Sequence, residues 1–567
     1  MSYTILGVHD GHCASAALMV DGRIVKAAQE ERFVNIKNEP GMPLHAIRYC
    51  LKGIDTLNEV VLATKFIHEP EWYKKQDFWE KTRKDYYINK ITWPFRKRLD
   101  PYFRNRTVDR KKLLCKVLKS EDFRWSPEKI RVLDHHVSHA AAAYYGSHYE
   151  PGEEVTGLTA DGSGDGLSAT VSIGDEGGIL RRKFVSTRDD SIGEIYSLTT
   201  YYLGFRPWEH EYKLMGMAPY SKADPGITSK LFSLIETRPG RFKGMISADF
   251  AWSQLKQIYR LKRFDRICAS IQRWFEHMML SWISGVLSLS YPNKIACGGG
   301  DFMNVKTNQI IAQQPFIEDM FVFPSAGDES TSIGACMKVQ ADWCVEHGLH
   351  PKKMITPIGP LYLGPPAVTG FDIGKVCRER GWETWEEDDV AGYITDLLME
   401  GEIVARCSGR LEFGARALGN RSILADASNM DVKTPLNAKV KHRDFWMPFA
   451  PSVLSKEKGR LYENPNNVRS PYMIMAFNST EDGRRELAAA MHPWDFTLRP
   501  QEVEIEWNAS YWEVLEKWRR ASGNGGLLNT SFNVHGSPIV KDDATALWTL
   551  EQTGLENLVI DHRIIKK

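Results

Sequence analysis

A short pattern that occurs twice constrains this chain more than any other feature of its sequence. Residues 4–25 read TILGVHDGHCASAALMVDGRIV, and residues 155–180 read VTGLTADGSGDGLSATVSIGDEGGIL. Each stretch predicts a strand, a turn with an acidic residue and a glycine, a second strand, a glycine turn and a third strand. The two stretches therefore indicate an internal repeat of one supersecondary unit.

Two such units that face each other predict an α/β fold of the duplicated actin/ribonuclease-H-like (ASKHA) type. In that architecture the phosphates of a nucleotide lie between the glycine turns, where backbone N–H groups hold them. The alternative is that the two stretches are unrelated β-hairpins, which are common in proteins.

The bulk composition is that of a soluble globular protein. The length of 567 residues predicts two or more domains. A net charge of +1 argues against a surface that binds nucleic acid as a whole. Nine cysteines without a CxxC pair disfavour a zinc ribbon and a disulfide framework. The N-terminus lacks a signal-peptide pattern and no apolar run could span a bilayer, so the sequence predicts a cytoplasmic protein without membrane partners.

A metal site is indicated by two histidines and two aspartates. The stretch IRVLDHHVSHAAAAYYG predicts a strand and then a helix that begins at His135. His135 and His139 are four residues apart, so they lie on one helical face, where two imidazoles can bind one metal ion. Asp161 and Asp328 each follow a predicted strand and could complete the site. The alternative is that the histidines merely cap or pad the start of the helix.

A nucleotide site is indicated further along the first part of the chain. The strand KIACGGG ends in glycines, including Gly299 and Gly300, which can bring the backbone close to a nucleotide. On the helix that follows, Asn304 and Asn308 lie one turn apart. In EYKLMGMAPY, Glu211 and Lys213 stand beside a predicted glycine turn.

Residues 350–370 are dense in proline and glycine and predict the connection between two domains, residues 1–355 and residues 356–567. Within the first domain, residues from about 72 to 125 form an insertion rich in basic and aromatic side chains. Such a segment can stack on a nucleic acid or neutralise an anionic acceptor. We favour an inserted helical subdomain with a solvated basic face, because neighbouring acidic residues keep the chain neutral.

The second predicted domain concentrates basic residues beside glycine turns. Guanidinium groups match phosphate and carboxylate oxygens, so the cluster predicts an anion site. The alternative is a set of surface salt bridges. The cluster consists of Arg410, Arg416, Arg421, Lys441 and Arg443.

Many of these stretches belong to a longer series of motifs between residues 3 and 560. The series is HCASAA, EERF, HHVSHAAAAYY, DGSGDG, EYKLMGMAPY, CGGGDFMN, GDESTSIGA, EFGARALGNRS, APSVL and LLNTSFN. In kind and order it resembles the NodU/CmcH family of O-carbamoyltransferases. The resemblance implies an N-terminal domain like the universal tRNA threonylcarbamoyl transferase and a YrdC-like α/β C-terminal domain.

The resemblance also implies a reaction in two steps. The YrdC-like domain makes carbamoyl adenylate from carbamoyl phosphate and ATP with Mg²⁺, and releases pyrophosphate. The N-terminal domain transfers the carbamoyl group to a hydroxyl of a small natural-product or sugar-type acceptor. A divalent metal, usually Fe²⁺ in this family, assists the transfer.

Roles follow for individual residues from the same resemblance. His135, His139, Asp161 and Asp328 match the metal ligands. His12 matches the histidine beside the transferred group, and with Asp161 and Arg416 it makes up the implied catalytic set. Lys37 matches a lysine that contacts the adenylate. Further nucleotide and carbamoyl-phosphate contacts are implied for Asn304, Asn308, Arg416, Lys441, Arg499, Asn529 and Ser531.

The sequence departs from the family at two positions, with Met447 in place of the usual arginine and Ala415 in place of the usual proline. Loss of a phosphate-facing arginine weakens anion binding by about 1.5–3 kcal/mol unless another cation, Arg443 or His442, compensates. The alternatives to O-carbamoyl transfer are carbamoylation of an amine, a protein thiol or a nucleic-acid base, or a regulatory protein that binds nucleotide without catalysis. The sequence leaves the oligomeric state open, with a homodimer among the options.

Overall fold

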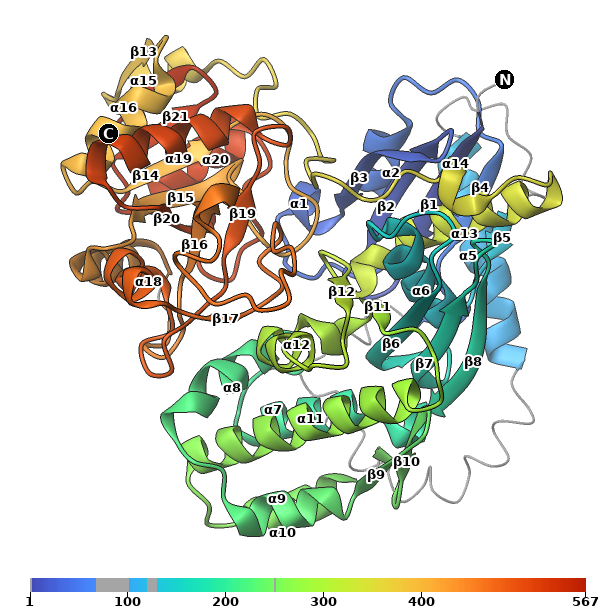
Figure 1. Cartoon of the computed structure of the whole chain (residues 1–567). Helices are drawn as coiled ribbons and strands as arrows, with labels where there is room; N and C mark the ends of the chain where they lie inside the picture. Colours follow the sequence, from blue (N-terminus) through green and yellow to red (C-terminus); the bar gives the residue numbers. More distant parts are fainter. Residues whose placement is uncertain (1–2, 68–100, 120–129, 249–250, 442) are drawn as a thin grey trace.

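The computed structural model describes residues 3–67, 101–119, 130–248, 251–441 and 443–567 (Figure 1). We call residues 3–355 the N-terminal half and residues 356–567 the C-terminal half. Both halves are mixed α/β. The predicted basic insertion falls largely outside the described residues, and α5 (Pro101–Lys119) is the main part of it that is described.

Two five-stranded sheets in the N-terminal half share one topology. In each sheet, three consecutive strands are antiparallel neighbours, and two later strands extend the sheet parallel to the first. The predicted repeat is therefore present. The first sheet has the order β3-β2-β1-β4-β5, with β1 (Thr4–His9), β2 (Ser15–Val20), β3 (Arg23–Gln29), β4 (Glu59–Leu62) and β5 (Ile130–Val132). The second has the order β12-β11-β6-β7-β8, with β6 (Val155–Gly164), β7 (Leu167–Gly174), β8 (Leu180–Thr187), β11 (Lys294–Gly298) and β12 (Asp319–Val322).

Aspartate–glycine pairs close one hairpin in each sheet. Asp21 and Gly22 join β2 to β3 with φ angles of 48° and 79°, and Asp165 and Gly166 join β6 to β7 with φ angles of 52° and 84°. Positive φ at both central positions is the geometry of a type I′ turn, whose twist matches that of the flanking strands. These pairs therefore fix the register of both hairpins.

A pair of helices lies between the two sheets (Figure 1). Helix α13 (Thr331–Glu346) packs on β1 and β2, while α6 (His135–Gly146) packs on β6, β11 and α13. The two helices are in close contact, because a Cβ atom at Gly334 would lie 1.9 Å from the carbonyl oxygen of Ser138. This packing brings the start of α6 and the segment before α13 to one place.

Further helices cover the second sheet. In α11 (Phe264–Leu287) apolar residues at helical spacing, such as Ile271, Trp274 and Trp282, are buried. The neighbouring helices are α7 (Ile192–Tyr202), α8 (Glu211–Met217), α9 (Pro225–Phe232), α10 (Ala251–Tyr259) and α12 (Val305–Ala312), with the small hairpin of β9 (Ile235–Arg238) and β10 (Arg241–Gly244). Helices α1 (Glu31–Val34), α2 (Leu44–Leu51) and α14 (Pro351–Met354) complete the N-terminal half.

The C-terminal half is built on one eight-stranded sheet with the order β13-β22-β21-β14-β15-β20-β16-β19. Its strands are β13 (Glu383–Glu386), β14 (Val404–Cys407), β15 (Arg421–Asp426), β16 (Ala450–Leu454), β19 (Gln501–Val503), β20 (Gly526–Ser531), β21 (Asn557–Ile560) and β22 (Arg563–Lys566). Helices α16 (Val390–Met399) and α19 (Ala509–Ser522) pack against it through an apolar cluster that includes Leu398, Val514 and Trp518. The remaining elements are α15 (Ile373–Arg380), α17 (Lys433–Leu436), α18 (Glu481–Glu486), α20 (Asp543–Gln552) and the pair β17 (Phe477–Asn478) and β18 (Thr497–Leu498).

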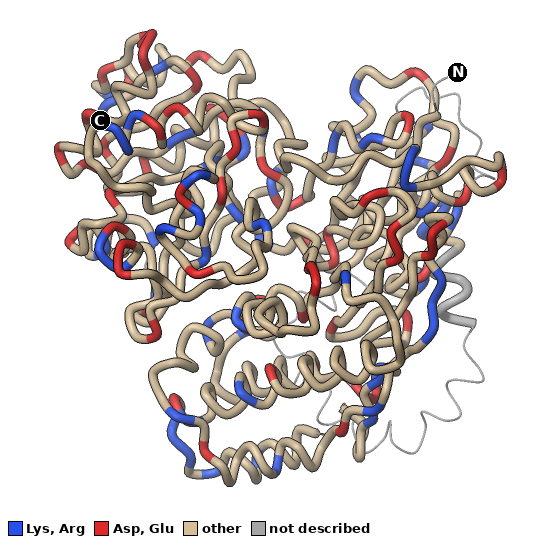
Figure 2. Tube along the Cα trace, viewed as in Figure 1, with Lys and Arg blue, Asp and Glu red and all other residues tan. Residues whose placement is uncertain are grey.

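Basic and acidic residues are interspersed along the trace of both halves (Figure 2), in line with the nearly neutral net charge. Among the described helices, none has both the length and the apolar character that a bilayer crossing requires.

Candidate active site

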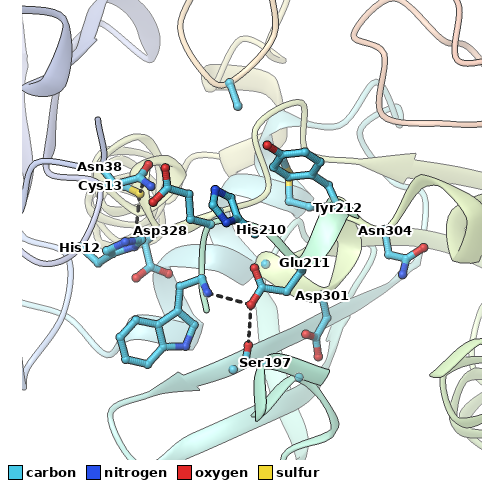
Figure 3. Close-up of a pocket in the computed structure, with 18 of the residues that line it drawn as sticks. His12, Cys13, Asn38, Ser197, His210, Glu211, Tyr212, Asp301, Asn304 and Asp328 are labelled. Atoms are coloured by element: carbon cyan, nitrogen blue, oxygen red, sulfur yellow. Dashed lines mark hydrogen bonds between the residues drawn. The ribbon is translucent and has the colours of Figure 1, made fainter. Parts of the chain in front are cut away.

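Both halves contribute walls to one cavity of about 1800 Å³. Figure 3 shows part of it, with His12, Cys13 and Asn38 grouped together, and with Asp301 and Asn304 on the other side of Glu211 and Ser197. Predicted site residues that line the cavity are His12, Lys37, His135, Asp161, Gly300, Asn304 and Asp328 from the N-terminal half, and Arg416, Lys441, Arg443, Arg499 and Ser531 from the C-terminal half.

Four of these predicted residues form a compact histidine–carboxylate cluster. One ligand atom from each of His135, His139, Asp161 and Asp328 lies within 4.8 Å of the others. The Nε2 atom of His135 lies 3.4 Å from Oδ2 of Asp161 and 3.5 Å from Oδ1 of Asp328. The Nε2 atom of His139 lies 3.7 Å from Oδ1 of Asp328. Two imidazole nitrogens and two carboxylate oxygens suit a first-row divalent ion.

Hydrogen bonds from the surrounding backbone orient this cluster. The backbone N–H of His135 donates to Oδ2 of Asp165 at 2.7 Å, which fixes the start of α6. The backbone N–H of Gly300 donates to Oδ1 of Asp161 at 2.9 Å. The hydroxyl of Ser330 lies 3.3 Å from Nδ1 of His139, the nitrogen that faces away from the cluster. Such outer contacts set the orientation of metal-binding side chains.

The charges of the cluster are complementary. Burial disfavours ionisation of Asp328, but His135, His139 and His9 outweigh burial and hold the pKa of Asp328 well below its usual range. Burial lowers the pKa of His135, yet Asp328 and Asp161 prevail and raise that pKa to about 9. The two carboxylates therefore attract positive charge, and a divalent cation can replace the proton on His135.

His12 lies in the turn between β1 and β2, close to the histidine–carboxylate cluster. The Nε2 atom of His9 donates to the carbonyl oxygen of His12 at 2.9 Å, and the same Nε2 lies 3.9 Å from Oδ2 of Asp328. The Nδ1 atom of His12 lies 3.2 Å from the sulfur of Cys13. Burial lowers the pKa of His12, so the imidazole is neutral near pH 7. A neutral imidazole in a cavity can accept a proton.

The C-terminal half presents a cationic cluster to the same cavity. Burial, together with Arg416 and Arg443, holds the pKa of Arg499 well below its ordinary value. Burial likewise lowers the pKa of Arg443 to about 10 and lowers that of Lys441. Within the described part of the chain, no ion pair involves these four side chains, although Lys441 bonds to Ser531 and Asn533 and Arg443 to Thr530. Cations that face a cavity without acidic partners can bind an anion.

Two family models match the chain. One is described as carbamoyltransferase N-terminus and matches residues 4–337, and the other as carbamoyltransferase C-terminus and matches residues 395–567. The chain belongs to the carbamoyltransferase family. The protein is therefore a carbamoyltransferase enzyme.

Relatives from nodulating bacteria agree with this assignment. Nodulation protein NolNO of Sinorhizobium fredii is 29% identical over 99% of this chain and 79% of its own length. Nodulation protein NolO of Bradyrhizobium diazoefficiens is 29% identical over 77% of this chain and 79% of its own length. The solved structure of HypF from T. kodakarensis covers 62% of this chain and 50% of its own, at 12% identity and a TM-score of 0.31, which is too low to support a conclusion.

Two predicted contacts of the carbamoyltransferase are placed elsewhere because their side chains hold the fold together. Arg421 is fully buried and donates to backbone carbonyls that include those of Ser408 and Lys541. Asn529 is 2% exposed, and its amide donates to Ser452 and Gln501 inside the sheet. Neither side chain lines the cavity.

Three more predicted contacts are also displaced from the cavity surface. Asn308 is buried and donates to the carbonyls of Phe302 and Ile474. Lys213 pairs with Asp444 of the C-terminal half at 3.0 Å, and the glycine turn predicted beside it is helix α8. Gly299, with φ of 99°, does not line the cavity. It packs closely against β6, because a Cβ atom there would lie 2.2 Å from the carbonyl oxygen of Ala160.

The structure also adds residues that sequence reasoning missed. His9, Trp208 and Asp301 all line the cavity, together with Glu211, which the motif EYKLMGMAPY already offered beside Lys213. The signal for His9 and Asp301 was present, because each lies within a stretch that was used for another residue, HDGHC and CGGGDFMN. The pKa of Asp301 is raised well above the ordinary value by burial, then by Asp161 and Glu211.

Proposed function

We propose that this enzyme is an ATP-dependent O-carbamoyltransferase with two chemical sites in one cavity. Residues 1–355 make up an actin-like transfer domain, and residues 356–567 a YrdC-like domain that forms carbamoyl adenylate. The observation that carries the proposal is that the cationic cluster around Arg416 and the transfer residues around His12 line the same cavity.

The first step takes place at the cationic cluster. Carbamoyl phosphate, ATP and one water give carbamoyl adenylate, pyrophosphate and phosphate. Arg416, Arg443 and Arg499 bind the phosphoryl oxygens and neutralise the charge that develops on them. Lys441, held by Ser531 and Asn533, adds a fixed point charge. ATP brings Mg²⁺ with its phosphates.

The second step takes place beside His12. The acceptor oxygen attacks the carbamoyl carbon, the bond from that carbon to the AMP oxygen breaks, and AMP leaves. We assign the acceptor proton to Nε2 of His12, since Nδ1 faces the sulfur of Cys13. Lys37, which pairs with Glu209 at 3.3 Å, and Asn304 lie on the cavity wall to hold the adenylate. Because both sites line one cavity, the intermediate need not leave the protein between the two steps.

The histidine–carboxylate cluster fits a divalent metal by donor type and spacing, and Fe²⁺ is our assignment. Such an ion, when bound, supplies a Lewis acid for a carbonyl or phosphoryl oxygen. The chain's own contribution is to orient His135 through Asp165, His139 through Ser330 and Asp161 through Gly300.

The acceptor in this proposal is a hydroxyl of a small molecule. Pyrophosphate release by the purified enzyme tests the first half of the scheme. It should require both ATP and carbamoyl phosphate and no acceptor. Release that occurs with ATP alone, or that never occurs, contradicts the adenylate route. Mass spectrometry of acceptor alcohols then tests whether the carbamoyl group reaches oxygen.

A further inference from the structure

Four described residues other than glycine on the cavity wall have a left-handed backbone. Among the described residues other than glycine, Cys13, Asn38, Asp165 and Trp208 combine a positive φ with a place on the cavity wall. Asparagine and aspartate tolerate this left-handed region, because their short polar side chains bond locally. A bulky aromatic residue does not, so Trp208 with φ of 62° is the outlier. A strained residue on a cavity wall motivates a functional hypothesis.

A hydrogen bond to the side chain of Glu211 holds the backbone conformation of Trp208. Its backbone N–H donates to Oε1 of Glu211 at 2.7 Å. The same carboxyl oxygen accepts from the hydroxyl of Ser197 at 3.0 Å (Figure 3). The backbone of Trp208 is thus fixed by the half-buried carboxyl group of Glu211 at the start of α8, which Ser197 of helix α7 holds in turn.

The held backbone directs the indole toward the transfer histidine. The ring centroids of Trp208 and His12 are 6.2 Å apart with an interplanar angle of 64°. Trp208 is partly exposed, and the cavity wall also includes Phe66, which is 49% exposed. An indole beside the proton acceptor offers a large, rigid apolar surface at little entropic cost.

We infer that Trp208 is the acceptor-binding platform and makes the enzyme select acceptors that present a ring face, with the reacting hydroxyl at the ring edge toward His12. This inference rests on the proposed function. The shared chemistry is a flat apolar face, which either the C–H face of a pyranose or an aromatic ring can supply. An acyclic polyol has hydroxyls but no such face.

The test uses the full-length enzyme and three probe acceptors. They are methyl glucopyranoside, benzyl alcohol and the acyclic sorbitol, and the measured quantity is the rate of carbamoyl product formation. The parent should have a kcat/KM at least about tenfold higher for one ring acceptor than for sorbitol. Which ring acceptor reacts distinguishes the pyranose face from the aromatic face.

Three variants separate recognition from folding. Trp208→Asn removes the ring, and asparagine tolerates the left-handed backbone, so we expect an unchanged or higher Tm. The KM for the ring acceptor should rise at least about tenfold. The ratio of kcat/KM for the ring acceptor to kcat/KM for sorbitol should fall close to one. Trp208→Phe should keep most of the preference. Phe496→Asn is the matched control, because Phe496 has φ of 56°, is 40% exposed and lies outside the cavity wall. It should leave transfer unchanged.

Pyrophosphate release without acceptor separates a failure of the role inferred for Trp208 from a failure of the proposed first step. If the parent and Trp208→Asn release pyrophosphate at rates within about twofold of each other, the proposed first step stands. Any change in the rate of carbamoyl transfer then reports on the role of Trp208 in the second step. The inference is overturned if the parent uses sorbitol and the ring acceptors equally, or if it reacts with neither ring acceptor. It is also overturned if Trp208→Asn keeps the preference of the parent for the ring acceptor. Absence of pyrophosphate release from the parent overturns the proposed function itself.

Discussion

The Nε2 atoms of His135 and His139 lie 3.0 Å apart at the start of helix α6. Both nitrogens also lie within 3.7 Å of one oxygen of Asp328. A shared cation explains why two imidazoles converge on one carboxylate oxygen. A helix-capping role does not explain it, because a cap needs only one backbone N–H partner. Asp134 already fills that role by accepting from Val137 at 3.1 Å.

The first prediction is that His139→Ala lowers the metal content of the purified protein at least about tenfold. The variant loses one of the two imidazole ligands, and each ligand contributes strongly to the affinity for the metal ion. Elemental analysis of parent and variant measures it. His148→Ala is the matched control, because His148 pairs with Asp319 at 2.7 Å outside the cavity. Equal metal in parent and His139→Ala would exclude a role for His139 as a ligand.

The second prediction separates two arginines that look alike in the sequence. Arg421→Met should lower the free energy of unfolding by about 2–5 kcal/mol, because several buried carbonyls lose their donor. Arg416→Met should lower it by less than about 1 kcal/mol, because its guanidinium has a buried, unpaired Nε among the described residues. Urea denaturation of both variants measures the difference. Similar losses for the two would place both arginines in the scaffold.

The third prediction concerns Met447, which lines the cavity near Gly216 of α8. Met447→Arg should lower the KM for carbamoyl phosphate. Arg443→Ala should be more damaging in the parent than in the Met447→Arg background, since one cation can then replace the other. Steady-state kinetics on the parent, the two single variants and the double variant measure the coupling. Simple additivity would mean that Arg443 does not substitute for the missing arginine.

Much of the scaffold was predictable, because local rules determine it. The Asp–Gly hairpins, the alanine-rich helix after His135 and the apolar face of α11 each follow from short-range turn chemistry or periodicity. The spacing of His135 and His139 likewise depends only on helical geometry. These features needed no knowledge of distant contacts.

The orientation of single polar side chains was less predictable, because partners far away in the sequence decide it. Arg416 and Arg421 are five residues apart in one motif, yet Arg421 points to carbonyls such as that of Lys541 while Arg416 lines the cavity. Lys213 turns to Asp444 for the same reason. The left-handed backbone of Trp208 contradicts its own residue preference and depends on Glu211.

The central claim is that one cavity holds two separate chemical sites. Pyrophosphate release from ATP and carbamoyl phosphate, measured without acceptor in Arg416→Ala and His12→Ala, tests it most directly. We predict that Arg416→Ala loses release by at least about a hundredfold, while His12→Ala keeps most of it and loses carbamoyl transfer instead. If His12→Ala stops pyrophosphate release as completely as Arg416→Ala, the division between adenylate formation and transfer is wrong.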